Sequence, residues 1–214
     1  ENLYKETLKA NPNHVDAHNN LGVVLLQAGN LQKAKSCYEK AIEINPNYAN
    51  AHNNLGAVFK QLGKDQKAKS CYEKAIEINP NHVDAHNNLG NVLKALREFQ
   101  KAIGCYEKAI QINPNYANAH NNLGLVFDEL GEHKKAKRCY EKAIEINPNY
   151  VDAHNNLGLV FDELGEHKKA IGCYEKAIQM DSNYTAAHNN LGLAFDKLGE
   201  HKKAKRCYEK AIEI

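Results

Sequence analysis

The strongest constraint on this chain is a repeat of 34 residues that runs through its whole length. The phrase Ala-His-Asn-Asn-Leu-Gly occurs six times at this spacing, starting at residues 17, 51, 85, 119, 153 and 187. A fixed period of about 20–50 residues is typical of solenoids, in which each unit buries its apolar face only against its neighbours. The sequence therefore predicts stacked units instead of separate globular domains.

Each unit has the pattern of two helices joined by a turn. Apolar side chains recur with helical spacing in two segments, which in the first unit comprise Ala17, Leu21, Val24, Leu25 and Ala28, and then Ala34, Tyr38, Ala41 and Ile42. Gly29 lies between the segments and supplies the turn, and Pro46 ends the second segment. Gly22 and Ala34 remove side-chain bulk where the helices approach, so we expect Gly22 in close packing and not at a flexible point.

The positions that recur in every unit resemble the tetratricopeptide repeat motif. In the first unit they are Leu21, Gly22, Leu25, Gly29, Ala34, Tyr38, Ala41 and Pro46. The resemblance implies an all-α fold, a right-handed superhelical solenoid of antiparallel helix pairs with about thirteen helices. Its parts would be the second helix of a partial repeat at 1–14, full repeats at 15–48, 49–82, 83–116, 117–150 and 151–184, and a truncated repeat at 185–214.

A few positions depart from that motif. His18 and its equivalents replace the usual aromatic residue and are expected to fill its packing slot. With one such histidine per unit and no second ligand one turn away, the spacing predicts no zinc site. Arg97 replaces a turn glycine and Ser182 replaces the proline, which would loosen those turns locally. The histidines that begin the Lys-rich second segments are expected on a solvated face; they are His133, His167 and His201.

Charge and motif content exclude several functions. The 28 Lys and Arg residues against 26 Asp and Glu residues give a net charge of +2, too weak to indicate nucleic-acid or membrane binding. The apolar runs are also too short to cross a bilayer. No nucleophile with a base, Gly-rich phosphate loop or metal-ligand spacing occurs outside the repeat pattern. The sequence thus predicts no catalysis, no cofactor, and neither nucleic acid nor membrane as a partner.

The six cysteines occupy one repeated place in the unit. They are Cys37, Cys71, Cys105, Cys139, Cys173 and Cys207. Equivalent positions on successive packed helices lie about 8–10 Å apart, whereas a disulfide needs Cα atoms within about 7 Å. We therefore expect free thiols in a reducing compartment, which predicts the cytoplasm with the nucleus as the alternative.

The paired asparagines need an explanation, because Asn costs roughly 0.5 kcal/mol relative to Ala inside a helix. The resemblance implies that the first helix of each unit lines a concave groove. The second asparagines would form a ladder along it, at Asn20, Asn54, Asn88, Asn122, Asn156 and Asn190. A side-chain amide both donates and accepts, so it can bind one peptide unit of an extended ligand whatever that ligand's side chains are. This arrangement resembles the asparagine ladder in the repeat region of O-GlcNAc transferases.

The first asparagine of each pair is assigned a supporting place in the same groove. These residues are Asn19, Asn53, Asn87, Asn121, Asn155 and Asn189. The competing interpretation of both columns is that the amides link neighbouring helices or simply face water.

The groove columns that vary between repeats could select the ligand. Asp16, Asp84 and Asp152 also resemble groove positions of the transferases, and Asp128 and Asp162 make the C-terminal half more acidic. A partner with basic or hydroxyl-bearing residues toward that half is the prediction. Scattered solvated charge is the alternative.

Together these features predict a protein-interaction scaffold that holds an extended peptide segment in an Asn-lined groove. One alternative is the substrate-recognition arm of a larger glycosyltransferase. Another is a structural array in which uncapped terminal helices associate end to end with other copies.

Overall fold

Helices joined by short turns make up the whole chain. The computed structural model describes residues 1–214 and contains thirteen α-helices and no strand, which confirms the all-helical repeat fold predicted above. The chain forms two compact units, Glu1–Pro114 and Asn115–Ile214. None of the helices is both long and apolar enough to span a lipid bilayer.

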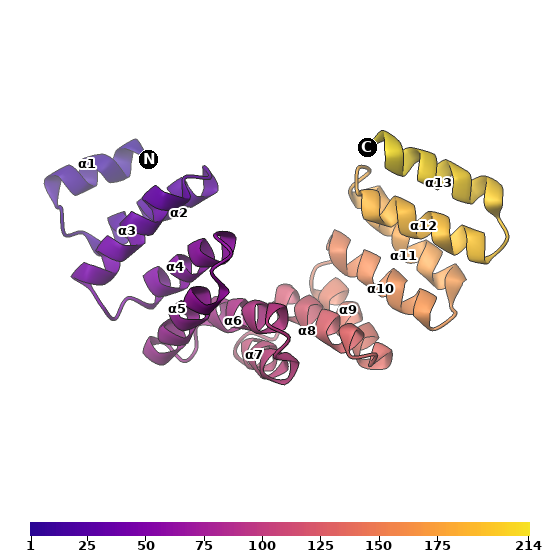
Figure 1. The fold of residues 1–214 in the computed structure, drawn as a ribbon, viewed down its shortest axis with the longest axis horizontal. Helices are drawn as coiled ribbons and strands as arrows, with labels where there is room; N and C mark the ends of the chain where they lie inside the picture. Colours follow the sequence, from indigo (N-terminus) through magenta and orange to yellow (C-terminus); the bar gives the residue numbers. More distant parts are fainter. The chain divides into compact units, whose positions relative to one another are not determined.

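The helices follow one another as pairs (Figure 1). The first unit contains α1 (Asn2–Ala10), α2 (Val15–Gln27), α3 (Leu31–Ile44), α4 (Ala49–Gln61), α5 (Asp65–Ile78), α6 (Val83–Ala95) and α7 (Phe99–Ile112). The second contains α8 (Ala117–Glu129), α9 (His133–Ile146), α10 (Val151–Glu163), α11 (His167–Met180), α12 (Thr185–Lys197) and α13 (His201–Glu213). The even-numbered helices are the first helices of the repeats, and the odd-numbered ones are the second helices.

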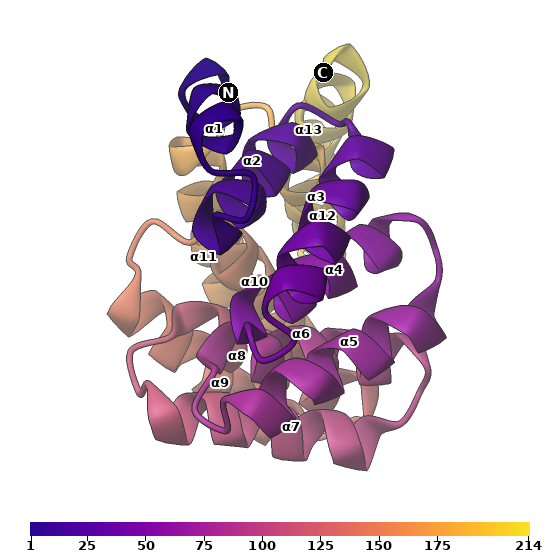
Figure 2. The same ribbon diagram turned by 90° about the vertical axis from the view of Figure 1, so that its left-hand side faces the viewer.

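First and second helices occupy different faces of each unit. Every first helix packs on the second helix that follows it and on the one that precedes it within the unit. First helices of successive repeats also contact each other, α2 with α4 and α4 with α6 in one unit, and α8 with α10 and α10 with α12 in the other. Second helices make no such contact with one another inside a unit. The first helices therefore form one layer of each stack and the second helices form the other; the first unit faces the viewer in Figure 2.

A glycine and a tyrosine form the centre of each helix pair. Tyr38 is completely buried, and a Cβ atom added to Gly22 would lie 2.5 Å from its ring carbon Cε1. Gly56 meets Tyr72 and Gly124 meets Tyr140 in the same way. This contact explains a glycine inside a helix, where it costs about 1 kcal/mol relative to Ala. The ring occupies the space that a side chain would fill.

The turn between repeats is stabilised by an asparagine. Asn45 ends α3 in an extended conformation, as expected before Pro46, and its Oδ1 accepts a hydrogen bond from the Asn47 backbone N–H at 3.0 Å. Where Ser182 replaces the proline, Asp181 accepts the same bond from the Asn183 N–H at 3.0 Å. The turn thus keeps its form without the proline.

The histidines of the first helices also hold this turn. His18 Nε2 donates to the Pro12 carbonyl at 2.8 Å, and the same bond recurs from His52, His86 and His154 to Pro46, Pro80 and Pro148. His188 donates to Ser182 at 3.0 Å. The imidazole therefore packs where the aromatic residue was expected and in addition satisfies a turn carbonyl.

The turn inside the third repeat is strained. Five turn glycines have φ between 68° and 75°, and Arg97 adopts φ 60° in the same place. A non-Gly residue pays roughly 1–2 kcal/mol in this left-handed region, and the Arg97 guanidinium, 5.5 Å from the Phe99 ring centroid, offsets part of that.

We expect Arg97→Gly to raise the free energy of unfolding by about 0.5–1 kcal/mol, because relief of the strain exceeds the entropy that Gly adds to the unfolded chain. Amide hydrogen exchange in α6 and α7 would measure this gain in stability. Arg97→Ala keeps the strained φ and serves as the control. Equal protection in both variants would contradict the explanation.

Candidate functional site

The paired asparagines of the first unit form a continuous chain of hydrogen-bonded amides. Asn54 Nδ2 donates to Asn19 Oδ1 of the preceding repeat at 2.9 Å, and Asn88 Nδ2 donates to Asn53 Oδ1 at 3.1 Å. Within a repeat, Asn19 Nδ2 donates to Asn20 Oδ1 at 3.2 Å and Asn53 Nδ2 to Asn54 Oδ1 at 3.3 Å. The amides therefore link α2, α4 and α6, as the competing interpretation of the sequence proposed.

The second unit carries the same links between repeats. Asn156 Nδ2 donates to Asn121 Oδ1 at 3.2 Å, and Asn190 Nδ2 donates to Asn155 Oδ1 at 2.9 Å. Each net hydrogen bond contributes about 0.5–1.5 kcal/mol, which offsets the poor helix propensity of the two asparagines.

The two asparagine columns differ in their exposure. The first asparagines are buried except for Asn189, which is exposed; the buried ones are Asn19, Asn53, Asn87, Asn121 and Asn155. The second asparagines, from Asn20 to Asn190, are half-buried. An amide has two N–H donors and two acceptor sites on its oxygen, so Asn54, which donates one bond and accepts one, keeps one of each. At the half-buried second column, Asn54 therefore keeps amide atoms that a ligand can bind.

The aspartates near the start of the first helices are exposed, and Asp16 and Asp152 bind the tyrosine that precedes the following first helix. Tyr48 donates to Asp16 Oδ1 at 2.6 Å, and Tyr184 donates to Asp152 Oδ1 at 2.7 Å. Burial raises the pKa of Tyr184 to about 12, and the bond to Asp152 adds to that effect. Asp84 is exposed as well. Asp16 and Asp152 therefore lie on the first helices and each already accept one hydrogen bond.

The aspartates near the end of the first helices are tied to the second helices. His133 Nδ1 donates to Asp128 Oδ1 at 2.8 Å, and His167 Nδ1 donates to Asp162 Oδ1 at 2.8 Å. Tyr174 also donates to Asp162 Oδ2, at 3.1 Å. Asp162 is only 8% exposed and is therefore not a groove-surface carboxylate; its two donors lie on α11.

The last repeat repeats this arrangement in a more open setting. His201 donates to Asp196 at 3.0 Å and Tyr208 donates to it at 2.9 Å, and these bonds lower the pKa of the Asp196 carboxyl. The sequence signal for the pairing is an Asp followed five residues later by His across the turn glycine. In the second repeat the same two positions hold the reversed pair, Lys60 with Asp65 at 3.0 Å. The neighbouring lysines predicted a solvated face for these histidines. Instead His133 and His167 are half-buried, and only His201 is exposed.

The cysteines are free and half-buried. Burial raises the pKa of the Cys71, Cys105 and Cys173 thiols to about 11 in each case. Because the thiolate is the reactive form, these side chains act as packing groups.

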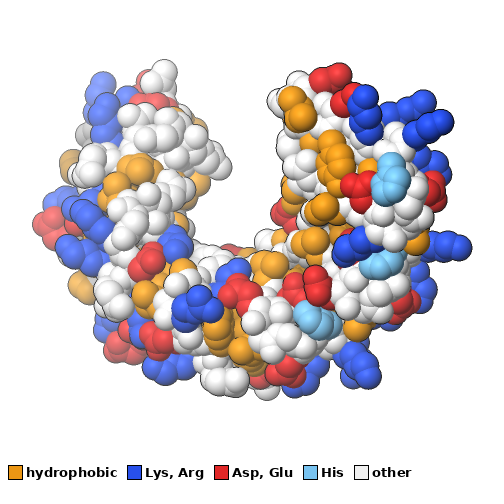
Figure 3. All heavy atoms as spheres, turned by 45° about the vertical axis from the view of Figure 1, so that its right-hand side comes forward, with side chains coloured by type: hydrophobic (Ala, Val, Ile, Leu, Met, Phe, Trp, Pro, Cys, Tyr) orange, Lys and Arg blue, Asp and Glu red, His pale blue; other side chains and the backbone are white.

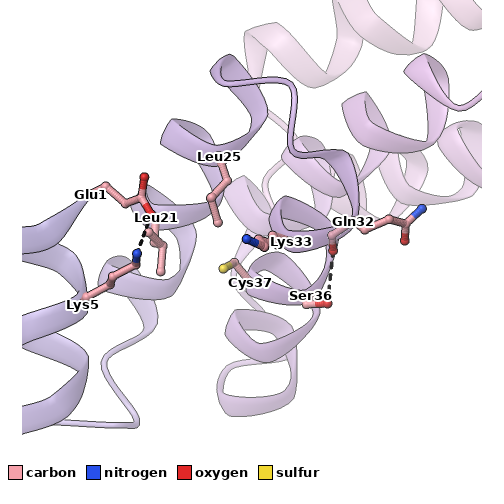
Figure 4. A pocket seen from close by; sticks show the side chains of 8 residues that line it. All are labelled: Glu1, Lys5, Leu21, Leu25, Gln32, Lys33, Ser36 and Cys37. Carbon is pink, nitrogen blue, oxygen red and sulfur yellow. Dashed lines mark hydrogen bonds and ion pairs between the residues drawn. The ribbon is translucent and has the colours of Figure 1, made fainter.

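A cavity of about 530 Å³ lies between α1 and α3 (Figure 4). Leu21 and Leu25 of α2 form its apolar floor, and the Lys5–Glu1 ion pair at 2.6 Å borders it. α1 spans nine residues where α3 spans fourteen, so it covers less of α2. No asparagine of either column lines this cavity, so it is separate from the candidate site.

Comparison with known proteins identifies the repeat. One model described as tetratricopeptide repeat matches residues 15–81 and 81–149, and a second with the same description matches 151–184 and 185–214. No curated protein matches the sequence.

Several solved structures share the fold. A structure of MamA is 31% identical, with a TM-score of 0.67 over 74% of this chain and 93% of MamA. PilF of Pseudomonas aeruginosa is 25% identical, with a TM-score of 0.83 over 90% of this chain and 88% of PilF. A chain of the APC/C hetero-tetramer Cut9–Hcn1 reaches a TM-score of 0.88 over 99% of this chain and 42% of its own, but at 16% identity it shows the fold alone.

Proposed function

Because the chain belongs to the tetratricopeptide repeat family, we propose that it is a protein-interaction scaffold that binds an extended segment of a partner on its first-helix face. The second asparagines would bind the backbone of that segment. They are Asn20, Asn54, Asn88, Asn122, Asn156 and Asn190.

The observation that carries this proposal is the unequal exposure of the two columns. Apart from the exposed Asn189, the first asparagines are buried, and Asn19, Asn53, Asn121 and Asn155 accept the links between repeats. The second asparagines are half-buried, and Asn54 keeps amide capacity beyond its two bonds. Neighbouring helices lie about 8–10 Å apart, and an extended chain advances about 3.3 Å per residue. One amide would therefore meet roughly every third ligand residue in each unit.

The acidic residues give this ligand a preferred charge. Asp16, Asp84 and Asp152 lie exposed on the same helices, so basic or hydroxyl-bearing ligand residues would be favoured beside them. Asp162 is excluded from this contact because it is buried.

The test compares the two asparagine columns by fluorescence anisotropy on hits from an array of peptides of about twelve residues. Asn54→Ala with Asn156→Ala removes two surface amides and their links between repeats. Asn53→Ala with Asn155→Ala is the matched control, because it also breaks links between repeats but changes only buried amides.

We expect similar losses of thermal stability in both variants, and about tenfold weaker peptide binding only when the second asparagines change. Equal affinities in the two variants would contradict the proposal. Light scattering on each sample excludes end-to-end association, for which the exposed Leu3 and Ile212 on α1 and α13 are the candidates.

A further inference from the structure

A row of leucines lies beside the asparagines of the second unit. The residue three positions after each second asparagine is Val23, Ala57, Asn91, Leu125, Leu159 or Leu193 along the chain. Leu159 is 37% exposed and Leu193 is 52% exposed, whereas the neighbouring Val160 is fully buried. Figure 3 shows hydrophobic side chains in a row on this unit. Leu125, at the same place in α8, is half-buried and packs against the core, so the row is exposed at Leu159 and Leu193. Neighbouring exposed apolar side chains indicate an interaction surface, and here they share a face with the half-buried second asparagines.

We propose that the leucine row and the second asparagines of α8, α10 and α12 bind a polyproline II segment with an apolar side chain at every third residue and basic side chains between them. The leucine row is defined as Leu125, Leu159 and Leu193. This inference rests on the proposed function and names the ligand of the same face.

The spacing of the helices selects this conformation. The amide links from Asn156 to Asn121 and from Asn190 to Asn155 keep α8, α10 and α12 directly side by side, at the roughly 8–10 Å typical of packed helices. Polyproline II has three residues per turn and a rise of about 3.1 Å, so every third side chain returns to one face after about 9.3 Å. In a β-strand the side chains on one face repeat after two residues, about 6.6 Å, which does not match the row.

The half-buried amides of the second asparagines point to the same conformation. A polyproline II backbone makes no internal hydrogen bonds, so its carbonyl groups, and N–H groups outside proline, are free to bind an amide. An α-helical ligand could repeat every two turns at about 10.5 Å, but its backbone groups are already paired internally. Only the open backbone would use the surface amides of Asn156 and Asn190, each of which donates one bond to the preceding repeat.

Negative charge one helical turn beyond the leucines explains why the proposed ligand carries basic residues. Glu129 and Glu163 follow Leu125 and Leu159 by one helical turn, are exposed, and form no ion pair. Lys197 takes this place in the last repeat. The ligand would therefore carry cations over α8 and α10 and none over α12.

The experiment uses synthetic peptides and the whole chain. Peptides built from Leu-Pro-Lys repeats place Leu at every third residue, and composition-matched peptides place Leu at every second or every fourth. Binding is measured by fluorescence anisotropy. We expect the every-third peptide to bind about tenfold more tightly than the others.

Variants assign that preference to the leucine row. The double variant Leu159→Asn with Leu193→Asn introduces asparagine, which the third repeat already carries at this position as Asn91. The fold should therefore tolerate the change. We expect the advantage of every-third spacing to disappear without a change in melting temperature. Val23→Asn, in the other unit, is the control and should leave it intact. Glu163→Gln should weaken the Lys-bearing peptide about threefold and leave a Leu-Pro-Gln peptide unchanged.

The outcomes separate the two proposals. If peptides bind through the second asparagines with no preference for every-third leucine, the polyproline II inference is wrong and the proposed function stands. If no peptide of any spacing binds to the folded chain, both fail.

Discussion

Tyr140→Ala should lower the free energy of unfolding by about 3–5 kcal/mol, the usual cost of deleting a large buried ring. Tyr140 is completely buried between α8 and α9, and its hydroxyl has no hydrogen-bond partner. The loss should therefore come from packing alone. Tyr140→Phe is the matched control and should be neutral or slightly stabilising, because it removes an unpaired buried polar atom.

The glycine opposite the ring makes this prediction sharper. A Cβ atom on Gly124 would lie 2.6 Å from Tyr140 Cε1, so Gly124→Ala should destabilise the native chain through overpacking, which costs about 1–3 kcal/mol. In the Tyr140→Ala background the ring is gone, and the same change should stabilise α8 by about 1 kcal/mol through helix propensity. Hydrogen exchange in α8 and α9 measures both, since unfolding of a repeat array need not be two-state. An effect of the same sign in both backgrounds would overturn the explanation.

His167→Leu should be the second large effect, with a loss of about 1.5–3 kcal/mol. It removes one of two side-chain donors to the buried Asp162 carboxylate, and hydrogen bonds to charged groups are worth about that much. The partial exposure of His167 places the loss toward the lower end, because water can reach the vacated side.

The first repeat supplies the control for this change. It carries Leu26 and Leu31 at the positions of Asp162 and His167, and its Tyr38 hydroxyl is buried without a partner. Asp162→Leu together with His167→Leu should therefore recover most of the stability, since apolar replacement of a buried polar pair is often neutral. Urea melts of the single and double variants give the comparison. A double variant less stable than His167→Leu would show that the pair is needed as such.

Much of the fold could be predicted because its causes are local and repeated. Helical spacing, the turn glycine and the proline each act within a few residues, and the 34-residue period shows that each unit meets the same neighbour. The close fit at Gly22 was predictable for the same reason, as no other role explains a glycine inside a helix six times. The sequence showed that Arg97 replaces a turn glycine. The structure shows that the turn nevertheless keeps its left-handed conformation, at a cost in backbone strain.

The candidate site was less predictable because its contacts join residues that are distant in the sequence. Asn54 and Asn19 are 35 residues apart, and the sequence offered no means of deciding whether their amides meet each other or a ligand. The Asp162–His167 pair is only five residues apart, yet its burial depends on α11 and was hidden by the neighbouring lysines. The exposure of Leu159 and Leu193 also needed the structure, since Leu159 and the buried Leu157 look alike in the sequence.

The sequence by itself determined the repeating helix pair, its turns and the close packing at the helical glycine, because periodicity and backbone sterics depend on nearby residues. Tertiary structure alone decided which polar atoms are used between helices and which remain at the surface. That division follows from hydrogen-bond geometry, which requires donor and acceptor within about 3 Å and is set only when the helices pack. In the Asn-Asn pair it assigns the first asparagine to the interior and leaves the second half exposed.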